Sequence, residues 1–127
     1  MTTQETLKVR NAAKYSIFPD SNRSEPLSQL AHWFGDSDLQ KMRPESKLHL
    51  LAILAQWQAG NTQQEGYYSL TESFYGYAFF DDVPEDVEHA IVSLSGLTND
   101  DCFHLMVALA LQIKHWIYQS LTTATNH

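Results

Sequence analysis

The chain has 127 residues, of which 43% are hydrophobic and 18% are charged. This length gives room for one domain, and the composition is too apolar for a disordered chain. The longest apolar run, residues 102–113, is too short to cross a bilayer. The single cysteine, Cys102, excludes an internal disulfide and a cysteine-rich metal scaffold. The first residues lack the basic start and apolar core of a secretory signal, so we expect a cytoplasmic protein without membrane insertion.

The charge is distributed unevenly along the chain. Residues 1–47 hold seven of the eight Lys and Arg residues against six acids, whereas residues 48–127 hold Lys114 against nine acids. The two balances, +1 and −8, give the net charge of −7. So acidic a surface repels a phosphate backbone, and we expect no nucleic-acid binding. The acidic portion either meets a basic partner or is a solvated face that keeps the protein soluble.

Residues 1–23 are expected to form an N-terminal arm, and residues 24–127 a helical bundle domain. The arm is mostly polar. It also contains an apolar patch, Tyr15, Ile17 and Phe18, which is large enough to hold it against the body of the domain.

Apolar residues at helical spacing, bounded by capping residues, predict four main helices and a shorter fifth one. Gly35, Gly60 and Gly96 are interpreted as helix ends, and residues 61–66 as a loop. Gly76 weakens the fifth helix. No convincing strand remains, so the predicted fold class is all-α, a single-domain bundle of four to five helices. The expected ranges are 25–34, 44–59, 69–80, 84–95 and 99–120.

A weak internal repeat accompanies these helices. His-Leu at 49–50, followed by Leu-Ala at 54–55, recurs as His-Leu at 104–105 and Leu-Ala at 109–110. Each copy follows a shorter helix that ends at a glycine. The repeat therefore favours two helix pairs packed with approximate two-fold symmetry.

Two Asp-x-x-His pairs stand on predicted helices, Asp86 with His89 and Asp101 with His104. An acid and a histidine three residues apart share a helix face, a geometry that di-metal bundles use with Glu as the acid. Both aspartates also lie near a helix start, where first-turn capping explains them. We expect no metal and no other cofactor, which makes a metal-dependent enzyme the least favoured function.

Cys102 and His104 stand two residues apart on one predicted helix, so they point in different directions and cannot form a nucleophile–base pair. A cysteine inside an apolar helix is typically an inert core residue. The sequence contains no Gly-rich phosphate loop, no Gly-x-Ser-x-Gly elbow and no His-Glu-x-x-His motif. We therefore expect a protein that is not an enzyme.

Seven of the fifteen aromatic residues lie between positions 67 and 80. Tyrosine has an apolar body and a polar tip, and it recurs where a flat ligand or a partner surface is held. We expect Phe74, Tyr77 and Phe80 to form a core layer. We expect exposure and partner contact for Tyr67, Tyr68 and Tyr75.

The chain resembles the N-terminal helical domain of the cyanobacterial orange carotenoid proteins. The similarity lies in Ile-Phe-Pro at 17–19, Pro-x-x-Lys-Leu at 44–48 and Gly-Leu followed by an acidic cap at 96–101. These short matches are scattered over residues 17–111. The resemblance implies a helical fold and a cyanobacterial origin. It also implies an alternative function, a small binding protein for an apolar planar ligand such as a carotenoid.

The chain departs from this family where the pigment would lie. The family lines its carotenoid tunnel with Trp and Tyr in the middle of its core helices. This sequence has Leu51, Ala52 and Ala55 at those places, and Trp57 is the nearest aromatic residue on that helix.

The leading interpretation is a regulatory interaction module without catalytic activity, which contacts a protein partner that carries a basic surface. The last helix adds Trp116, Ile117 and Tyr118, whose side chains span too wide an arc to share one buried seam. With the exposed tyrosines they would form a patch that a two-fold homodimer covers. The predicted binding residues are Tyr67, Tyr68, Tyr75, Trp116 and Tyr118.

Overall fold

The computed structural model describes residues 15–19, 24–63 and 68–125, with the side chains of residue 63 and of residues 118–125 excepted. Over these residues the chain forms five α-helices and one 3₁₀ helix without any strand, which confirms the predicted all-α single-domain bundle. The elements are α2 (Glu25–Phe34), α3 (Pro44–Gln63), α4 (Leu70–Tyr75), η1 (Phe80–Asp82), α5 (Glu85–Ser93) and α6 (Asn99–Thr125).

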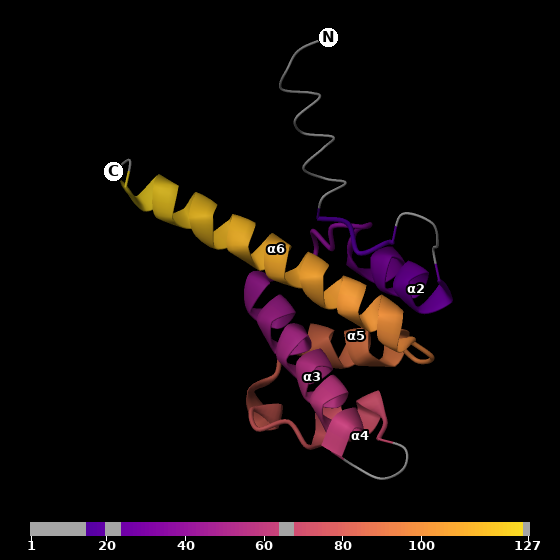
Figure 1. Cartoon of the computed structure of the whole chain (residues 1–127). Helices are drawn as coiled ribbons and strands as arrows, with labels where there is room; N and C mark the ends of the chain where they lie inside the picture. Colours follow the sequence, from indigo (N-terminus) through magenta and orange to yellow (C-terminus); the bar gives the residue numbers. More distant parts are fainter. Residues whose placement is uncertain (1–14, 20–23, 64–67, 126–127) are drawn as a thin grey trace.

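The bundle is organised around two long helices, α3 and α6. They pack against each other, with α5 beside α3 and α4 against the C-terminal part of α3 (Figure 1). Helix α2 packs on α5. The C-terminal half of α6 continues past the start of α3, whereas α4 lies at the opposite end of α3 (Figure 1). The two ends of the bundle are therefore built from different elements.

The apolar patch of the arm lies against the body, as the sequence predicts. Ile17 is fully buried in the core, and its N–H donates a hydrogen bond to the Ser37 carbonyl at 2.9 Å. Phe18 packs on the same core. The Tyr15 carbonyl accepts a hydrogen bond from Nε2 of Gln112 at 2.6 Å, which ties the segment to α6. The remaining arm positions, 1–14 and 20–23, lie outside the described residues.

The first helix has the bounds that its sequence predicts. Four apolar residues on one face of α2 are buried, and Gly35 ends the helix with φ +88°. In this left-handed conformation a side chain is strained, so glycine is the favoured residue. The predicted helix over 84–95 is shorter in the structure: α5 ends at Ser93 with Leu94 as its C-cap, and Gly96, with φ +84°, lies in the turn that follows.

The predicted end of the second helix is wrong, because α3 continues through Gly60 to Gln63. Glycine is needed at this position because a Cβ would overlap the ring of Tyr68. Nε1 of Trp57 also donates a hydrogen bond to the Tyr68 carbonyl at 2.8 Å. Gly60 is therefore a point of close approach and not a helix cap.

The predicted fifth helix over 69–80 is correct only in its first half. Ser69 and Glu72 form a capping box, in which the Ser69 Oγ accepts the Glu72 N–H at 3.0 Å. Helix α4 then stops at Tyr75, and Gly76 caps it. The chain turns before η1, so the aromatic residues after Gly76 follow no helical spacing.

Helix α6 starts where the sequence predicts and runs beyond the predicted end at 120 to Thr125. The Thr98 Oγ1 accepts the N–H of Asp101 at 3.2 Å and so caps the start of the helix. The two copies of the internal repeat lie on α3 and α6 with the same burial pattern: buried leucines, a half-buried histidine and an exposed alanine. These residues are His49, Leu50, Leu54 and Ala55 in α3, and His104, Leu105, Leu109 and Ala110 in α6.

Substituting Gly60 by Ala should destabilise the protein. Overpacking of this kind costs about 1–3 kcal/mol, more than the gain of about 1 kcal/mol in helix propensity. In a Tyr68→Ala background the overlap is gone, so Gly60→Ala should then raise the urea midpoint. A lowered midpoint in both backgrounds would refute the close-approach explanation. Gly76→Ala, at a position with φ −91°, serves as a control with a mild effect.

Lys47 should make the stability depend on alkaline pH. Its side chain is buried, and its Nζ donates a hydrogen bond to the Asp38 carbonyl at 3.3 Å. Burial lowers the pKa of Lys47, and the Asp38 charge raises it by less. Between this lowered pKa and the usual value of 10.5, the unfolded chain binds more protons, so the free energy of unfolding rises with pH. In urea titrations up to about pH 10, the free energy of unfolding of wild type and of Lys41→Met should rise relative to that of Lys47→Met. The raised pKa values of Cys102 and Tyr77 lower this free energy with pH in all three proteins alike, so they cancel in the comparison.

Candidate functional site

The aromatic stretch splits into buried and exposed members, though not fully as predicted. Phe74 is buried and Tyr77 is half-buried, as expected. Phe80 was expected in the core layer, but it is 37% exposed. Tyr75 is 63% exposed, in agreement with the prediction. The exposure of Phe80 follows from the end of α4 at Gly76, which removes Phe80 from the helical face that Phe74 occupies.

The expected exposure of Tyr68 is wrong, and that of Tyr67 lies outside the described residues. Tyr68 is half-buried and packs on the core beside Gly60. Tyr68 follows a loop, so no helical periodicity in the sequence predicts that it is half-buried. Its contact with Gly60 of α3 forms only in the folded chain.

Exposed aromatic residues gather at the end of α4 and at the start of η1. They are Tyr75, Phe79 and Phe80, which we call the aromatic surface. The Tyr75 and Phe80 rings lie 5.5 Å apart between centroids, and Phe80 stands edge-on to the buried Phe74 ring at 5.1 Å. The sequence does not single out Phe79, because its contact with His49 on α3 forms only when the chain is folded.

The second half of the aromatic surface rests on a histidine–tyrosine pair. Nδ1 of His49 lies 2.9 Å from the Tyr77 hydroxyl oxygen. The Phe79 ring packs on Tyr77 at 5.7 Å and on His49 at 6.4 Å. Burial raises the pKa of the Tyr77 hydroxyl. These contacts hold Phe79 in one place while most of its ring remains open to solvent.

Acidic residues flank the aromatic surface in the sequence. Residues 70–90 contain six Asp and Glu residues and no Lys or Arg. Three of the acids, Asp81, Asp82 and Glu85, are exposed directly after Phe80. The segment that carries the rings therefore has a negative charge.

The predicted patch joins the tyrosines to the end of α6, but its described members Tyr75 and Trp116 lie at different ends of the bundle. Trp116 is exposed, as expected. However, α4 with Tyr75 lies at one end of α3, and α6 projects past the other end (Figure 1). The Tyr118 side chain lies outside the described residues. Both residues are exposed as predicted, but they do not share one surface.

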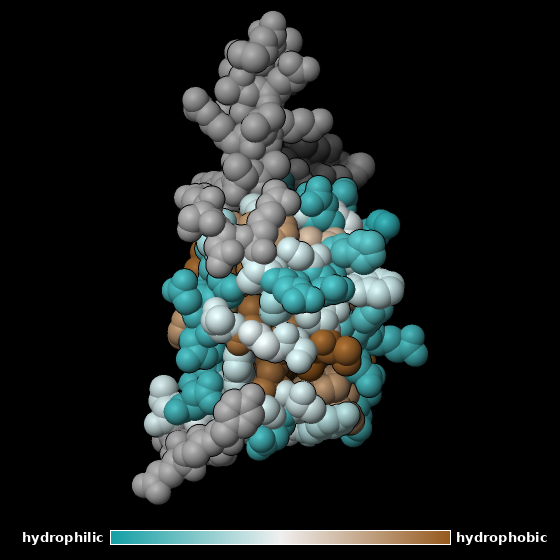
Figure 2. Space-filling view, turned by 90° about the vertical axis from the view of Figure 1, so that its right-hand side faces the viewer, coloured by the Kyte–Doolittle hydropathy of each residue, from teal (hydrophilic) through white to brown (hydrophobic). Residues whose placement is uncertain are grey.

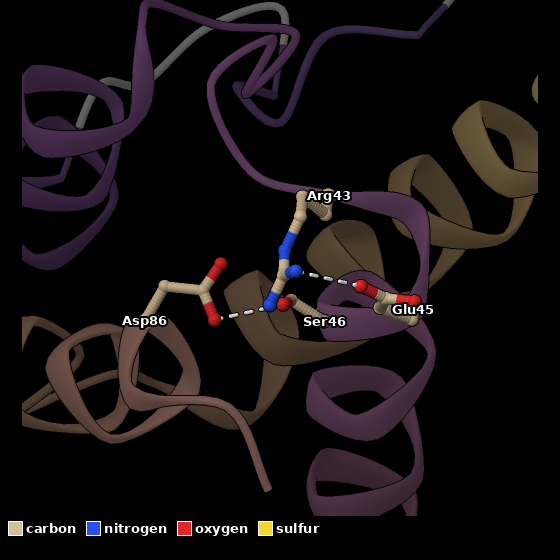
Figure 3. A network of polar contacts seen from close by, with 4 residues as sticks. All are labelled: Arg43, Glu45, Ser46 and Asp86. Carbon is tan, nitrogen blue, oxygen red and sulfur yellow. Dashed lines mark hydrogen bonds and ion pairs between the residues drawn. The ribbon is translucent and has the colours of Figure 1, made fainter.

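The first Asp-x-x-His pair is separated by its contacts with other elements. One carboxylate oxygen of Asp86 accepts a hydrogen bond from the fully buried Ser46 Oγ at 2.7 Å, beside the exposed Arg43–Glu45 ion pair (Figure 3). The His89 ring instead packs on Trp33, with 4.5 Å between centroids. Asp86 therefore joins α5 to the start of α3.

The second pair, Asp101 with His104, belongs to the first turn of α6. Asp101 is buried and its N–H completes the Thr98 cap. Within the described residues, no group of three or more Asp, Glu, His or Cys side chains has an arrangement that could hold a metal ion.

Cys102 is fully buried, where we expected an inert core residue. Burial raises the pKa of the Cys102 thiol, and a hydrogen bond with the Gln58 side chain lowers it by less. Its Sγ lies 3.9 Å from the Met106 Sδ. A protonated, inaccessible thiol is a poor nucleophile.

The bundle also has a shallow groove of about 310 Å³ between α3, α4 and the turn that follows α5. Trp57, Leu70, Ile91 and Leu97 contribute its apolar lining. The Trp57 N–H is already bonded to the Tyr68 carbonyl. The groove is at the small end of the range for ligand sites.

The face on the side of α2 and the start of α6 carries apolar and polar areas side by side. Figure 2 shows hydrophobic areas there that are interrupted by hydrophilic ones. No helix in the described part of the chain has the length and hydropathy needed to span a membrane.

A scan against protein-family models finds no match, and searches of curated proteins and solved structures find no significant similarity. The resemblance to the orange carotenoid proteins therefore stays a prediction.

Divalent metal ions should leave the stability unchanged. Asp86 and His89 have separate partners on α3 and α2, so an ion would have to break existing contacts to bind both. We expect the same melting temperature with zinc, iron(II) or chelator. A rise of several degrees that Asp86→Asn abolishes would contradict this reading.

Proposed function

We propose that the protein is a non-catalytic, regulatory helical module that acts through protein–protein contacts. The observation that carries this proposal is the aromatic surface, Tyr75, Phe79 and Phe80, exposed beside a run of acids. Large exposed apolar patches on a soluble domain mark sites of interaction. Cytoplasmic localisation and self-association, both expected from the sequence, belong to the same proposal.

The rings are suited to binding because they are already ordered. Phe80 is held edge-on by Phe74, and Phe79 packs on Tyr77 and His49. A partner that covers them immobilises few additional rotamers, so less conformational entropy is lost on association. Aromatic residues in such positions dominate the binding energy of many interfaces.

The charge around the rings indicates the chemistry of the partner. A segment with Lys or Arg between apolar residues would place its apolar side chains on the rings and its cations toward Asp81, Asp82 and Glu85. Cations also bind directly to the faces of Tyr and Phe. An acidic partner would meet like charge, so we assign the surface to a basic, apolar segment of another protein.

The side chains that could act as a nucleophile or as an acid or base support a non-catalytic role. Cys102 is buried with a raised thiol pKa, and Asp86 is bonded to Ser46. Each is used in packing or in joining helices. None of them lies on the aromatic surface.

The alternative function, binding of an apolar planar ligand such as a carotenoid, would use the groove beside Trp57. An absorption spectrum of protein purified from its native host separates the two functions. A stoichiometric visible pigment band would favour the alternative, whereas protein absorption alone agrees with the interaction module.

Selection of peptides from a random display library should yield basic sequences with apolar residues. Phe79→Ser should weaken binding of the selected peptides by about tenfold or more, because it removes an ordered ring from the centre of the surface. Binding should also weaken with added salt, since exposed charges contribute. Titration calorimetry with synthetic peptides measures both effects.

Val92→Ser is the matched control, because Val92 is an exposed apolar residue on α5 outside the aromatic surface. It should leave peptide binding unchanged. Circular dichroism checks that both variants keep their helices. Selected peptides without a basic bias, or binding that is indifferent to Phe79→Ser, would show that the surface has been assigned wrongly.

A further inference from the structure

Helix α6 carries a second apolar feature, on the side away from α3. Its members are Phe103, Val107, Ala110, Lys114 and Ile117, which we call the outer line. All five are exposed, with 53% exposure for Phe103 and 58% for Val107. The fully buried residues of α6, among them Leu105 and Leu109, lie on a different face of the helix. The outer line is therefore free of the bundle core.

The composition of the outer line is unusual for a surface. Between Asp101 and Ile113, the exposed side chains of α6 are those of Phe103, Val107 and Ala110, and all three are apolar. Exposed helix positions in a soluble protein are typically polar or charged. An apolar line in their place indicates that this face is covered in the working state of the protein.

The spacing of the outer line is that of a helix–helix seam. Its members alternate steps of four and three residues, which is the heptad spacing of a coiled coil. In heptad terms, Val107 and Lys114 are a positions, and Phe103, Ala110 and Ile117 are d positions. The occupant that fits such a seam is another α-helix.

The charge along the chain favours a second copy as that occupant. Residues 102–127 contain no acid and one Lys, although the whole chain has a net charge of −7. Two acidic molecules repel each other least where their surfaces lack acids. A strongly basic or acidic partner would find only Lys114 as a charged group on the outer line.

The geometry points to a two-fold dimer in which the outer lines of two copies pack antiparallel, with the axis at the level of residue 112. Val107 then lies opposite Ile117 of the second copy, and the small Ala110 lies opposite the long Lys114. The Lys114 stem crosses the Ala110 methyl group while its ammonium reaches water. One surface is thereby complementary to itself, as a two-fold interface requires.

A parallel arrangement lacks this complementarity. It would place Lys114 against Lys114 and Ala110 against Ala110, giving charge repulsion in one layer and a void in the next. The order of small and long residues thus selects the antiparallel orientation. The dimer rests on the self-association that is part of the proposed function, but it uses α6 alone, so a failure of the dimer would leave the proposed partner of the aromatic surface untouched.

Sedimentation equilibrium at micromolar concentration should report about twice the chain mass of 14.5 kDa for the full chain. Val107→Glu places a charge in the apolar seam and should raise the dimer dissociation constant by about tenfold or more. Val92→Glu adds the same charge at a 70% exposed position on α5 and should leave the dimer intact. A monomeric wild type, or equal effects of the two variants, would overturn the proposal.

Disulfide trapping tests the antiparallel orientation of the two α6 helices. It also tests the dimer itself if circular dichroism shows that Val107→Glu has lost its helices. An equimolar mixture of Val107→Cys and Ile117→Cys should cross-link, because these positions face each other. Val107→Cys alone should not, because its two copies lie about 15 Å apart along the axis, beyond disulfide reach. The natural Cys102 is buried, so the wild-type protein should not cross-link and serves as the control. Cross-linking of Val107→Cys alone would refute the antiparallel register.

Discussion

The packing of α3 against α6 is the contact on which the rest of the structure depends. Leu50 and Leu54 on α3, and Leu105 and Leu109 on α6, are fully buried. Both helices are apolar over more of their circumference than one contact can cover. Helices α4 and α5 cover further parts of α3, but no described element covers the outer line of α6. Part of the apolar surface of α6 therefore remains exposed.

Polar contacts of α3 fix α4, and through it the aromatic surface. The buried Ser73 Oγ donates a hydrogen bond to the Ile53 carbonyl at 3.0 Å, and Nε2 of Gln56 donates to the Ser73 carbonyl at 2.8 Å. Buried polar groups that are bonded in this way allow one position of α4 on α3. Because Gly60 admits the Tyr68 ring, the chain enters α4 at a defined place, and Tyr75 and Phe80 emerge on the surface.

Local signals predicted the fold well, and tertiary contacts account for the errors. The start of α6 after Thr98 and the end of α2 at Gly35 depend on neighbouring residues, so the sequence was sufficient there. In the sequence Gly60 looks like a glycine that ends a helix. Only the folded chain shows that it lies inside α3 and makes room for the Tyr68 ring. The candidate site was predicted in part: Tyr75 and Trp116 are exposed, but their distance apart depends on how α6 crosses α3, which no local pattern contains.

The aromatic surface and the outer line lie on different elements, so occupation of one leaves the other open. An antiparallel pair of α6 helices would leave the α4 end of each bundle unobstructed, and the dimer would present two aromatic surfaces. A partner with two basic segments would then bind the second one at a raised effective concentration, which increases the overall affinity without any new contact. Self-association through α6 would in this way regulate the strength of a contact made at the other end of the bundle.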